Sequence, residues 1–128
     1  MDKQVVSTDA APAAIGPYSQ AVATGQLIFC SGQVPFDPQT MELVSGSITE
    51  ETERCMRNLE AVLTEGGSGL DQIVKTTIYV TNMNDFVEVN EAYGSFFPSD
   101  PPARATVGVA ALPKGARVEI DCIATRRT

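Results

Sequence analysis

The amino-acid sequence predicts an α+β fold in which two helices cover one face of a mixed β-sheet. Apolar residues recur with the two-residue period of strands in some segments and with the 3.6-residue period of helices in others, in the order strands, helix, strand, helix, strands. The Gly and Pro residues fall between these segments, and no repeat or linker-like run divides the chain. We therefore expect one domain over residues 1–128, a length at which a single core buries roughly two-thirds of the unfolded chain's surface.

The first predicted strand covers residues 27–31, a short apolar run between Gly25 and Gly32. Proline at position 35 breaks the run and indicates a turn. Glu42-Leu43-Val44 could pair back on the preceding segment.

A helix is predicted to begin after Ser47, because Ser47 and Glu50 have the spacing of a capping box. Its apolar stripe recurs at helical spacing and consists of Cys55, Met56, Leu59, Val62 and Leu63. Gly66 and Gly67 supply the positive φ with which many helices end.

Residues 73–80 are β-branched or aromatic and predict a strand. Its alternation predicts one face made of Val74, Thr76, Ile78 and Val80. A second helix is expected to begin at Asn82 or Asn84 and to end before Pro98. Its apolar positions are Phe86, Val89, Tyr93, Phe96 and Phe97.

Two further strands are predicted at residues 103–110 and 117–125, separated by a turn at 112–115. In the last strand an apolar face alternates with a charged face made of Arg117, Glu119 and Asp121. The sheet face without helices is expected to be partly apolar through Ile28, Tyr79 and Ile123. Because water would otherwise touch that face, we expect the protein to form oligomers through it.

The chain contains no histidine, which excludes Ser-His-Asp and Cys-His catalysis, because imidazole activates those nucleophiles near neutral pH. Cys30, Cys55 and Cys122 are odd in number and widely spaced, a pattern typical of neither a disulfide framework nor a metal or redox pair. We expect buried, reduced thiols and no metal site.

Acidic residues outnumber basic residues by 16 to 9, for a net charge of -7. Nucleic-acid binding depends on clustered Lys and Arg, whereas here only Arg126 and Arg127 are adjacent. No segment resembles a signal peptide or approaches the roughly 20 apolar residues of a membrane span. We expect a soluble, cytoplasmic protein that binds neither membranes nor nucleic acid.

Arg104 is the first candidate for binding chemistry. It follows Pro101-Pro102-Ala103, a stiff segment, and it opens a predicted strand, so its guanidinium extends from the end of an element. A planar guanidinium can bind a carboxylate or a phosphate through two parallel hydrogen bonds. A surface or structural ion pair is the alternative.

Glu119, Tyr18 and the Ser31-Gly32 pair are the other candidates. If an oligomer interface encloses Glu119, desolvation raises its pKa and makes it a proton donor or acceptor; otherwise it is a solvated carboxylate on the sheet. The turn at residues 16–20 could aim the Tyr18 phenol into a pocket, or Tyr18 could be an ordinary half-buried aromatic. Gly32 could let a ligand approach the backbone N–H groups.

Taken together, these segments resemble the reactive intermediate deaminase family (RidA, or YjgF). The resemblance spans nearly the whole chain, through residues 13–21, 30–33, 75–80, 84–86, 89–90, 102–107, 112–114 and 118–120. Its most specific part is Pro102-Ala103-Arg104 followed at family spacing by Val118-Glu119-Ile120.

The resemblance implies a chorismate-mutase-like α+β fold with about six strands and two helices on one face of the sheet. It also implies a homotrimer with ligand clefts between subunits, without metal or cofactor. The implied activity is that of a 2-iminobutanoate/2-iminopropanoate deaminase. Such an enzyme hydrolyses 2-imino acids and their enamine tautomers, released by pyridoxal-phosphate enzymes, to 2-oxo acids and ammonia.

By the same resemblance, Arg104 clamps the substrate carboxylate, while Glu119 and Tyr18 serve proton transfer and positioning. The remaining substrate-binding positions are Ser31, Gly32, Asn90 and Thr106. Many family members have cysteine where this chain has Thr106, so backbone contacts rather than a thiol are implied there.

Two other functions remain open. A non-catalytic module that binds small carboxylates would use the same Arg104 cleft, and both functions need the same clamp. The family label has also been attached to endoribonuclease and translation-inhibition activity. A chain with a net charge of -7 and no histidine has poor means to hold RNA or to deprotonate a 2′-hydroxyl.

Overall fold

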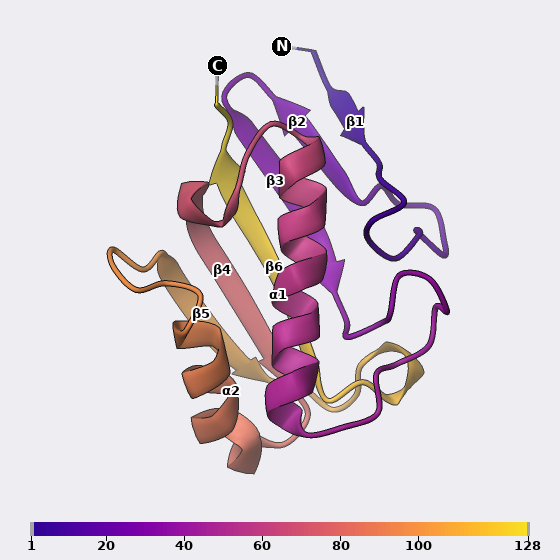
Figure 1. Ribbon diagram of the computed structural model, residues 1–128, viewed down its shortest axis with the longest axis vertical. Coiled ribbons are helices and arrows are strands. Elements are labelled where there is room, and N and C mark those ends of the chain that lie inside the picture. Colours follow the sequence, from indigo (N-terminus) through magenta and orange to yellow (C-terminus); the bar gives the residue numbers. More distant parts are fainter. Residues whose placement is uncertain (1, 128) are drawn as a thin grey trace.

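Within residues 2–127, which the computed structural model describes, six strands form one mixed sheet and two α-helices pack on the same face of it (Figure 1). The strands are β1 (Gln4–Val6), β2 (Ala21–Thr24), β3 (Leu27–Gln33), β4 (Ile73–Val80), β5 (Ala103–Gly108) and β6 (Val118–Thr125). The helices are α1 (Ile48–Glu65) and α2 (Phe86–Gly94). The predicted α+β class is confirmed.

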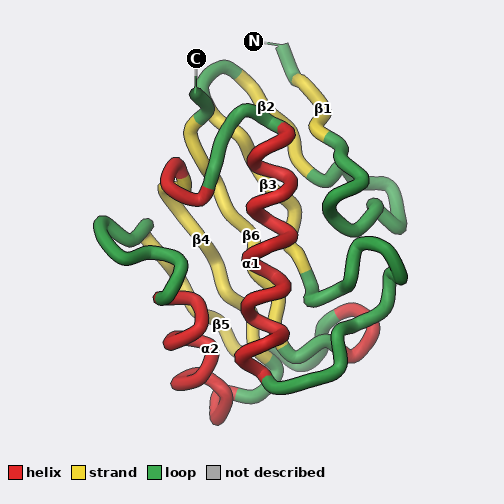
Figure 2. The backbone as a smooth tube through the Cα atoms, viewed as in Figure 1, coloured by secondary structure: helices red, strands yellow, loops and turns green. Residues whose placement is uncertain are grey.

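The strand order across the sheet is β1-β2-β3-β6-β4-β5. β4 and β5 are parallel, and the other neighbouring strands are antiparallel. Parallel strands need a long crossover, which α2 supplies between β4 and β5. The long loops before β2, after β3 and before β6 gather along one side of the molecule (Figure 2).

Helix α1 confirms its sequence prediction. The Glu50 N–H donates to the Ser47 hydroxyl over 3.1 Å, and the Glu50 carboxylate accepts from the Ser47 N–H over 3.2 Å, which completes the capping box. All five residues of the predicted stripe are fully buried. At the other end, Gly67 has the expected positive φ of 81°, whereas Gly66 does not, with φ of -84°.

The second helix is shorter than predicted. A 3₁₀ turn at Met83–Asp85, capped by the side chain of Asn82, precedes α2. The helix ends at Gly94, so Phe96 and Phe97 lie beyond it, although both still pack against the core. Glycine favours this early end because it is a poor helix former.

Two predicted strand faces each contain one misplaced residue, whereas their other members, Thr76, Ile78, Val80, Tyr79 and Ile123, lie as predicted. A register shift between Ile73 and Lys75 turns Ile73 into the core and leaves Val74 exposed. Ile28 is buried under α1, and the apolar residues of β3 on the uncovered face are Leu27 and Phe29, which are 38% and 42% exposed. In each case the predicted position is off by one residue. Because successive side chains of a strand point to opposite faces, a shift of one residue moves a side chain to the other face.

The last two predicted strands are present, but their bounds differ from the predicted ones. β5 ends at Gly108 and β6 begins at Val118, so Arg117 lies outside the strand. The Arg117 guanidinium pairs with Glu51 at the start of α1 instead of facing the open side of the sheet. Leu43 pairs back on Phe36 through an isolated bridge, as expected for residues 42–44. Strands β1 and β2 had no sequence prediction.

All three cysteines are buried and free, as predicted. Burial raises the pKa of Cys55. The hydrogen bond with Cys30, and secondly burial, raise the pKa of Cys122, so both thiols keep their protons. Among residues 2–127, no group of His, Cys, Asp or Glu is arranged to hold a metal ion. No helix in that range is long and apolar enough to cross a bilayer.

Candidate active site

Arg104 extends from β5 on the helix-covered side of the sheet. It pairs in register with Thr76, which is buried beneath the helices. Its Nη1 donates a 2.7 Å hydrogen bond to Oδ1 of Asn90 on α2. Its guanidinium carbon lies 5.2 Å from the ring centre of Tyr93 and 5.8 Å from that of Phe86. Helix α2 therefore holds the guanidinium by one hydrogen bond and two aromatic faces.

The Arg104 guanidinium has N–H donors left over after its hydrogen bond to Asn90. The side chain is exposed, and within residues 2–127 no carboxylate forms an ion pair with it. This argues against the alternative of a structural ion pair. Because Asn90 occupies one donor and carries no charge, the cation can still bind an incoming carboxylate through two parallel hydrogen bonds.

Thr106 lies two residues after Arg104 on the same side of β5, in register with Ile78. Its hydroxyl oxygen is buried without a hydrogen-bond partner in the described chain. Asn90, Arg104 and Thr106 thus form one group of predicted site residues on the helix-covered side of the sheet.

A separate cavity of about 460 Å³ contains the other four predicted site residues. These are Tyr18, Ser31, Gly32 and Glu119. The rest of its wall is mainly apolar and is formed by Pro12, Ala13, Ile15, Gln33, Val34, Phe36 and Pro113. These residues come from the three long loops and from the ends of β3 and β6, so distant parts of the chain form one wall.

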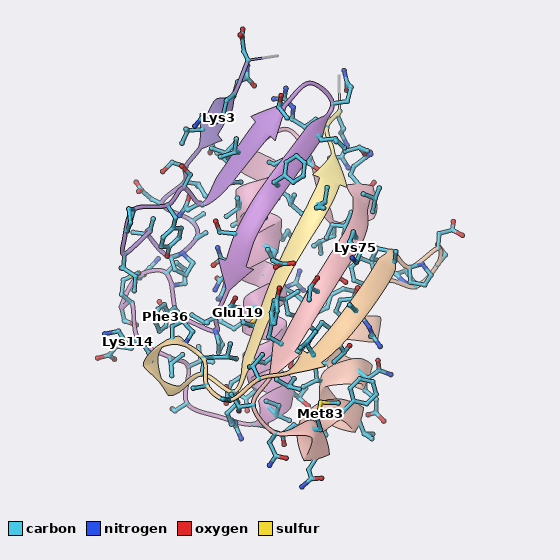
Figure 3. The ribbon with its side chains drawn as sticks, turned by 180° about the vertical axis from the view of Figure 1, so that it is seen from behind. Lys3, Phe36, Lys75, Met83, Lys114 and Glu119 are labelled. Atoms are coloured by element: carbon cyan, nitrogen blue, oxygen red, sulfur yellow. The ribbon has the colours of Figure 1, made fainter. Side chains whose placement is uncertain are left out.

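Glu119 lies on the open face of the sheet, on β6 (Figure 3). The half-buried position raises the pKa of its carboxyl, chiefly through desolvation and secondly through the negative charge of Asp121. A Cβ atom at Gly32 would lie 2.2 Å from Oε2 of Glu119, so any larger residue at position 32 would displace this carboxyl. The register of β3 shifts between Cys30 and Gln33, which places Gly32 in an irregular stretch beside it.

The Tyr18 phenol is held in the turn that carries it. Its hydroxyl oxygen accepts a 3.3 Å hydrogen bond from the Ile15 N–H, so its own proton remains free to donate. The Tyr18 N–H donates to the Gly16 carbonyl over 2.8 Å. The Ser31 hydroxyl donates to the Ser19 carbonyl over 2.6 Å and ties this turn to β3.

Two buried amides that the sequence analysis missed hold the cavity walls. Gln20 donates to the Pro12 carbonyl over 2.8 Å and accepts from the Thr8 N–H over 2.7 Å. Asn58, fully buried on α1, donates to the Phe36 carbonyl over 3.0 Å. The available signal for Asn58 was a polar residue beside the apolar stripe of a helix.

The two groups of site residues face opposite sides of the sheet. Glu119 pairs with Tyr79, and Tyr79 pairs with Val107, three residues beyond Arg104 on β5. Strand geometry then separates Arg104 from Glu119 by about 10 Å along the strands and about 10 Å across them. Arg104 turns toward α2, whereas Glu119 turns away from the helices. One chain alone does not bring the two side chains together.

Comparisons with known proteins agree over nearly the whole length of the chain. The family model described as Endoribonuclease L-PSP matches residues 8–126. Protein DfrA of Myxococcus xanthus is 52% identical over 126 residues, covering 97% of this chain and 96% of that protein. The mouse protein named 2-iminobutanoate/2-iminopropanoate deaminase is 48% identical over 124 residues, covering 97% of this chain and 92% of that protein.

A solved structure shows the same fold. Escherichia coli TdcF, crystallised with bound serine, is 38% identical and superimposes with a TM-score of 0.92, covering 97% of this chain and 99% of that chain.

Proposed function

This chain belongs to the RidA family, also described as the Endoribonuclease L-PSP family, and on that premise we propose that it is a 2-imino acid deaminase. It hydrolyses 2-iminobutanoate, 2-iminopropanoate and their enamine tautomers to 2-oxo acids and ammonia. The observation that carries the proposal is the cavity in which a desolvated carboxyl of raised pKa, Glu119, lies with the phenol of Tyr18, whose proton is free to donate.

Arg104 binds the substrate carboxylate through two parallel hydrogen bonds, and Asn90 holds the guanidinium in place for it. This fixes the imine carbon relative to the acid and base groups. Thr106 and the backbone of Ser31 and Gly32 complete the contacts to the substrate.

Proton transfer at Glu119 accounts for the chemical steps. The Glu119 carboxylate takes a proton from water as the water oxygen bonds to the imine carbon, and the C=N π electrons move to nitrogen. Tyr18 donates a hydrogen bond to that water or to the nitrogen. Protonated Glu119 returns that proton to nitrogen, which gives a carbinolamine. Glu119 then takes the proton of the new hydroxyl group and passes it to nitrogen, so that the C–N bond breaks and ammonia leaves as the C=O bond forms.

The active site is shared between two copies of the chain. Arg104, Asn90 and Thr106 come from one copy, and the cavity with Glu119 comes from its neighbour in a homotrimer. The opposite directions of Arg104 and Glu119 within one chain support this arrangement. Exposed apolar side chains on the open face, such as Leu27 and Phe29, supply surface for the contact.

A semicarbazide competition assay tests the activity. An amino-acid dehydratase generates 2-iminobutanoate, and semicarbazide traps it as an absorbing semicarbazone. Catalytic amounts of this protein are expected to suppress semicarbazone formation, because hydrolysis removes the imine before it is trapped. If the intact oligomer gives no suppression at any concentration, the deaminase assignment is wrong, and a carboxylate-binding module takes its place.

Mixed oligomers test the shared site. Arg104→Ala and Glu119→Gln are each expected to be inactive alone but to regain activity when the two chains are coexpressed. In a trimer that contains both chains, one of the three sites combines an intact Arg104 with an intact Glu119 from the neighbouring copy. The specific activity is measured on oligomers purified through two different tags. A mixture as inactive as either parent would contradict the shared site.

A carboxylate-binding module is the second candidate, because the TdcF crystals hold serine, a small carboxylate. It uses the same Arg104 fork but needs no proton transfer at Glu119. RNA cleavage, which the family description names, finds less support. The net charge of -7 opposes binding to a phosphate backbone, and the chain has no histidine to deprotonate a 2′-hydroxyl.

A further inference from the structure

A second carboxyl lies beside Glu119 on the open face of the sheet. Asp121 follows it by two residues on β6, and both side chains are partly buried. Tyr79 of β4 stands directly opposite Glu119 in the strand register. Its phenol reaches diagonally and donates a 3.0 Å hydrogen bond to Oδ2 of Asp121. Tyr79 is thus the neighbour of one carboxyl and the hydrogen-bond donor to the other.

The hydrogen bond fixes the position of the Asp121 carboxylate. Burial raises the pKa of Tyr79, and the hydrogen bond to Asp121 raises it further, so the phenol keeps its proton and remains a donor. Residues i and i+2 of a strand are about 7 Å apart, close enough for the charge of Asp121 to act on Glu119.

Asp121 is the one charged group of the described chain that raises the pKa of Glu119. Arg117, two residues before Glu119, turns its guanidinium to Glu51 at the start of α1 instead. The side chains around it on β3 and the cavity loops, Ser31, Tyr18 and Pro113, carry no charge. Cys55 of α1, on the core side, is a neutral thiol whose pKa burial raises. Lys75 is four residues from Tyr79 along β4, about 13 Å away.

In the proposed trimer, Arg104 of a neighbouring copy faces the cavity from the other side. That cation is kept in every variant described below, so its contribution cancels in the comparison.

We propose that Asp121 is a positioning residue for proton transfer at Glu119, and that Tyr79 holds Asp121 in place for this role. The inference rests on the proposed deaminase function, in which Glu119 must both take and return a proton in each cycle. A group with that double task works best when its proton affinity lies near the working pH. A fixed negative charge beside Glu119 moves its proton affinity in that direction.

The first test is the pH dependence of kcat/KM. In Asp121→Asn, the part of the pH profile that reports the ionisation of Glu119 is expected to move to lower pH by about 0.5–1.5 units. The reason is that the substitution removes a negative charge that repels the Glu119 carboxylate. Tyr79→Phe is expected to shift it in the same direction by less, because Asp121 keeps its carboxyl but loses its anchor. Asp121→Glu, which restores the charge, is expected to move the limb back.

Asp71→Asn is the matched control. Asp71 pairs with Arg127 on the surface and lies outside the cavity, so the same chemical change there is expected to leave the pH profile unchanged.

The second test observes Glu119 directly and does not need turnover. The carboxyl carbon of Glu119 is followed by NMR in protein labelled with ¹³C-glutamate, with Glu119→Gln used to assign the signal. A lower titration midpoint in Asp121→Asn than in wild type is expected, and coincident titrations would overturn the inference. If Asp121→Asn does not fold, a titration of Tyr79→Phe that coincides with wild type overturns it equally.

The two proposals fail separately. If the midpoint shifts but wild-type protein does not hydrolyse imines, the deaminase function and the role of Asp121 in it are both rejected. If wild type is active and the midpoint does not shift, only the role of Asp121 is rejected.

Discussion

Arg104→Ala is expected to lower kcat/KM for 2-iminobutanoate by about 100- to 1,000-fold while the fold and the assembly stay intact. Arg104 supplies the charge and the two-point hydrogen bonding that hold the substrate carboxylate. Without it the imine carbon is no longer positioned against Glu119. The side chain is exposed and lies in no ion pair of the described chain, so its removal leaves the core untouched.

Initial rates in the semicarbazide assay measure this loss, with thermal unfolding and sedimentation confirming the assembly. Arg57→Ala is the matched control, because Arg57 is also an exposed arginine over an aromatic ring, that of Phe96, but it lies outside the cavity with Glu119. It is expected to retain full activity. Arg104→Lys keeps the charge but loses the planar fork, so it should fall between wild type and Arg104→Ala. Full activity in Arg104→Ala would reject the clamp.

Glu119→Gln is expected to lower kcat by about 100- to 10,000-fold while the protein still binds 2-oxobutanoate, the reaction product. Glutamine keeps the shape of the side chain and its place beside Gly32, but it can neither take a proton from water nor return one to the leaving nitrogen. Binding is preserved because the Arg104 clamp is unchanged.

Rates and product binding by calorimetry, measured on the same preparation, separate the candidate functions. Glu42→Gln, a change of the same kind on a loop outside the cavity, serves as the control. Loss of turnover with retained binding supports catalysis at Glu119. Unchanged turnover would show that another group handles the protons.

Much of the candidate site follows from the chain's resemblance to a family, because its motifs are short and nearly complete. The resemblance assigns the site residues to one ligand cleft, whereas within one chain Arg104, Asn90 and Thr106 form one group and Tyr18 and Glu119 form another with the end of β3. Contacts between segments that are far apart in the chain could not be predicted, because no short sequence motif marks them. The hydrogen bond from Tyr79 to Asp121 joins residues 42 positions apart, and Asn58 holds a carbonyl 22 positions away.

The sequence by itself determines the elements whose signals are local. Helix α1 follows from a capping box within four residues and from an apolar stripe that repeats every turn. The alternation of β6 follows from a strict two-residue period. These patterns depend on near neighbours in the chain and need no knowledge of what packs against them.

Only the tertiary structure decides which face of each strand is covered and which site residues meet. A shift of one residue near Ile73 reverses the expected positions of two side chains, and no short pattern marks it. Arg104 and Glu119 point to opposite sides because Arg104 pairs with Thr76 and Glu119 with Tyr79, three residues along β4, and α2 covers only the side of Arg104. That division depends on how whole layers pack, and side-chain patterns along a single strand do not contain it.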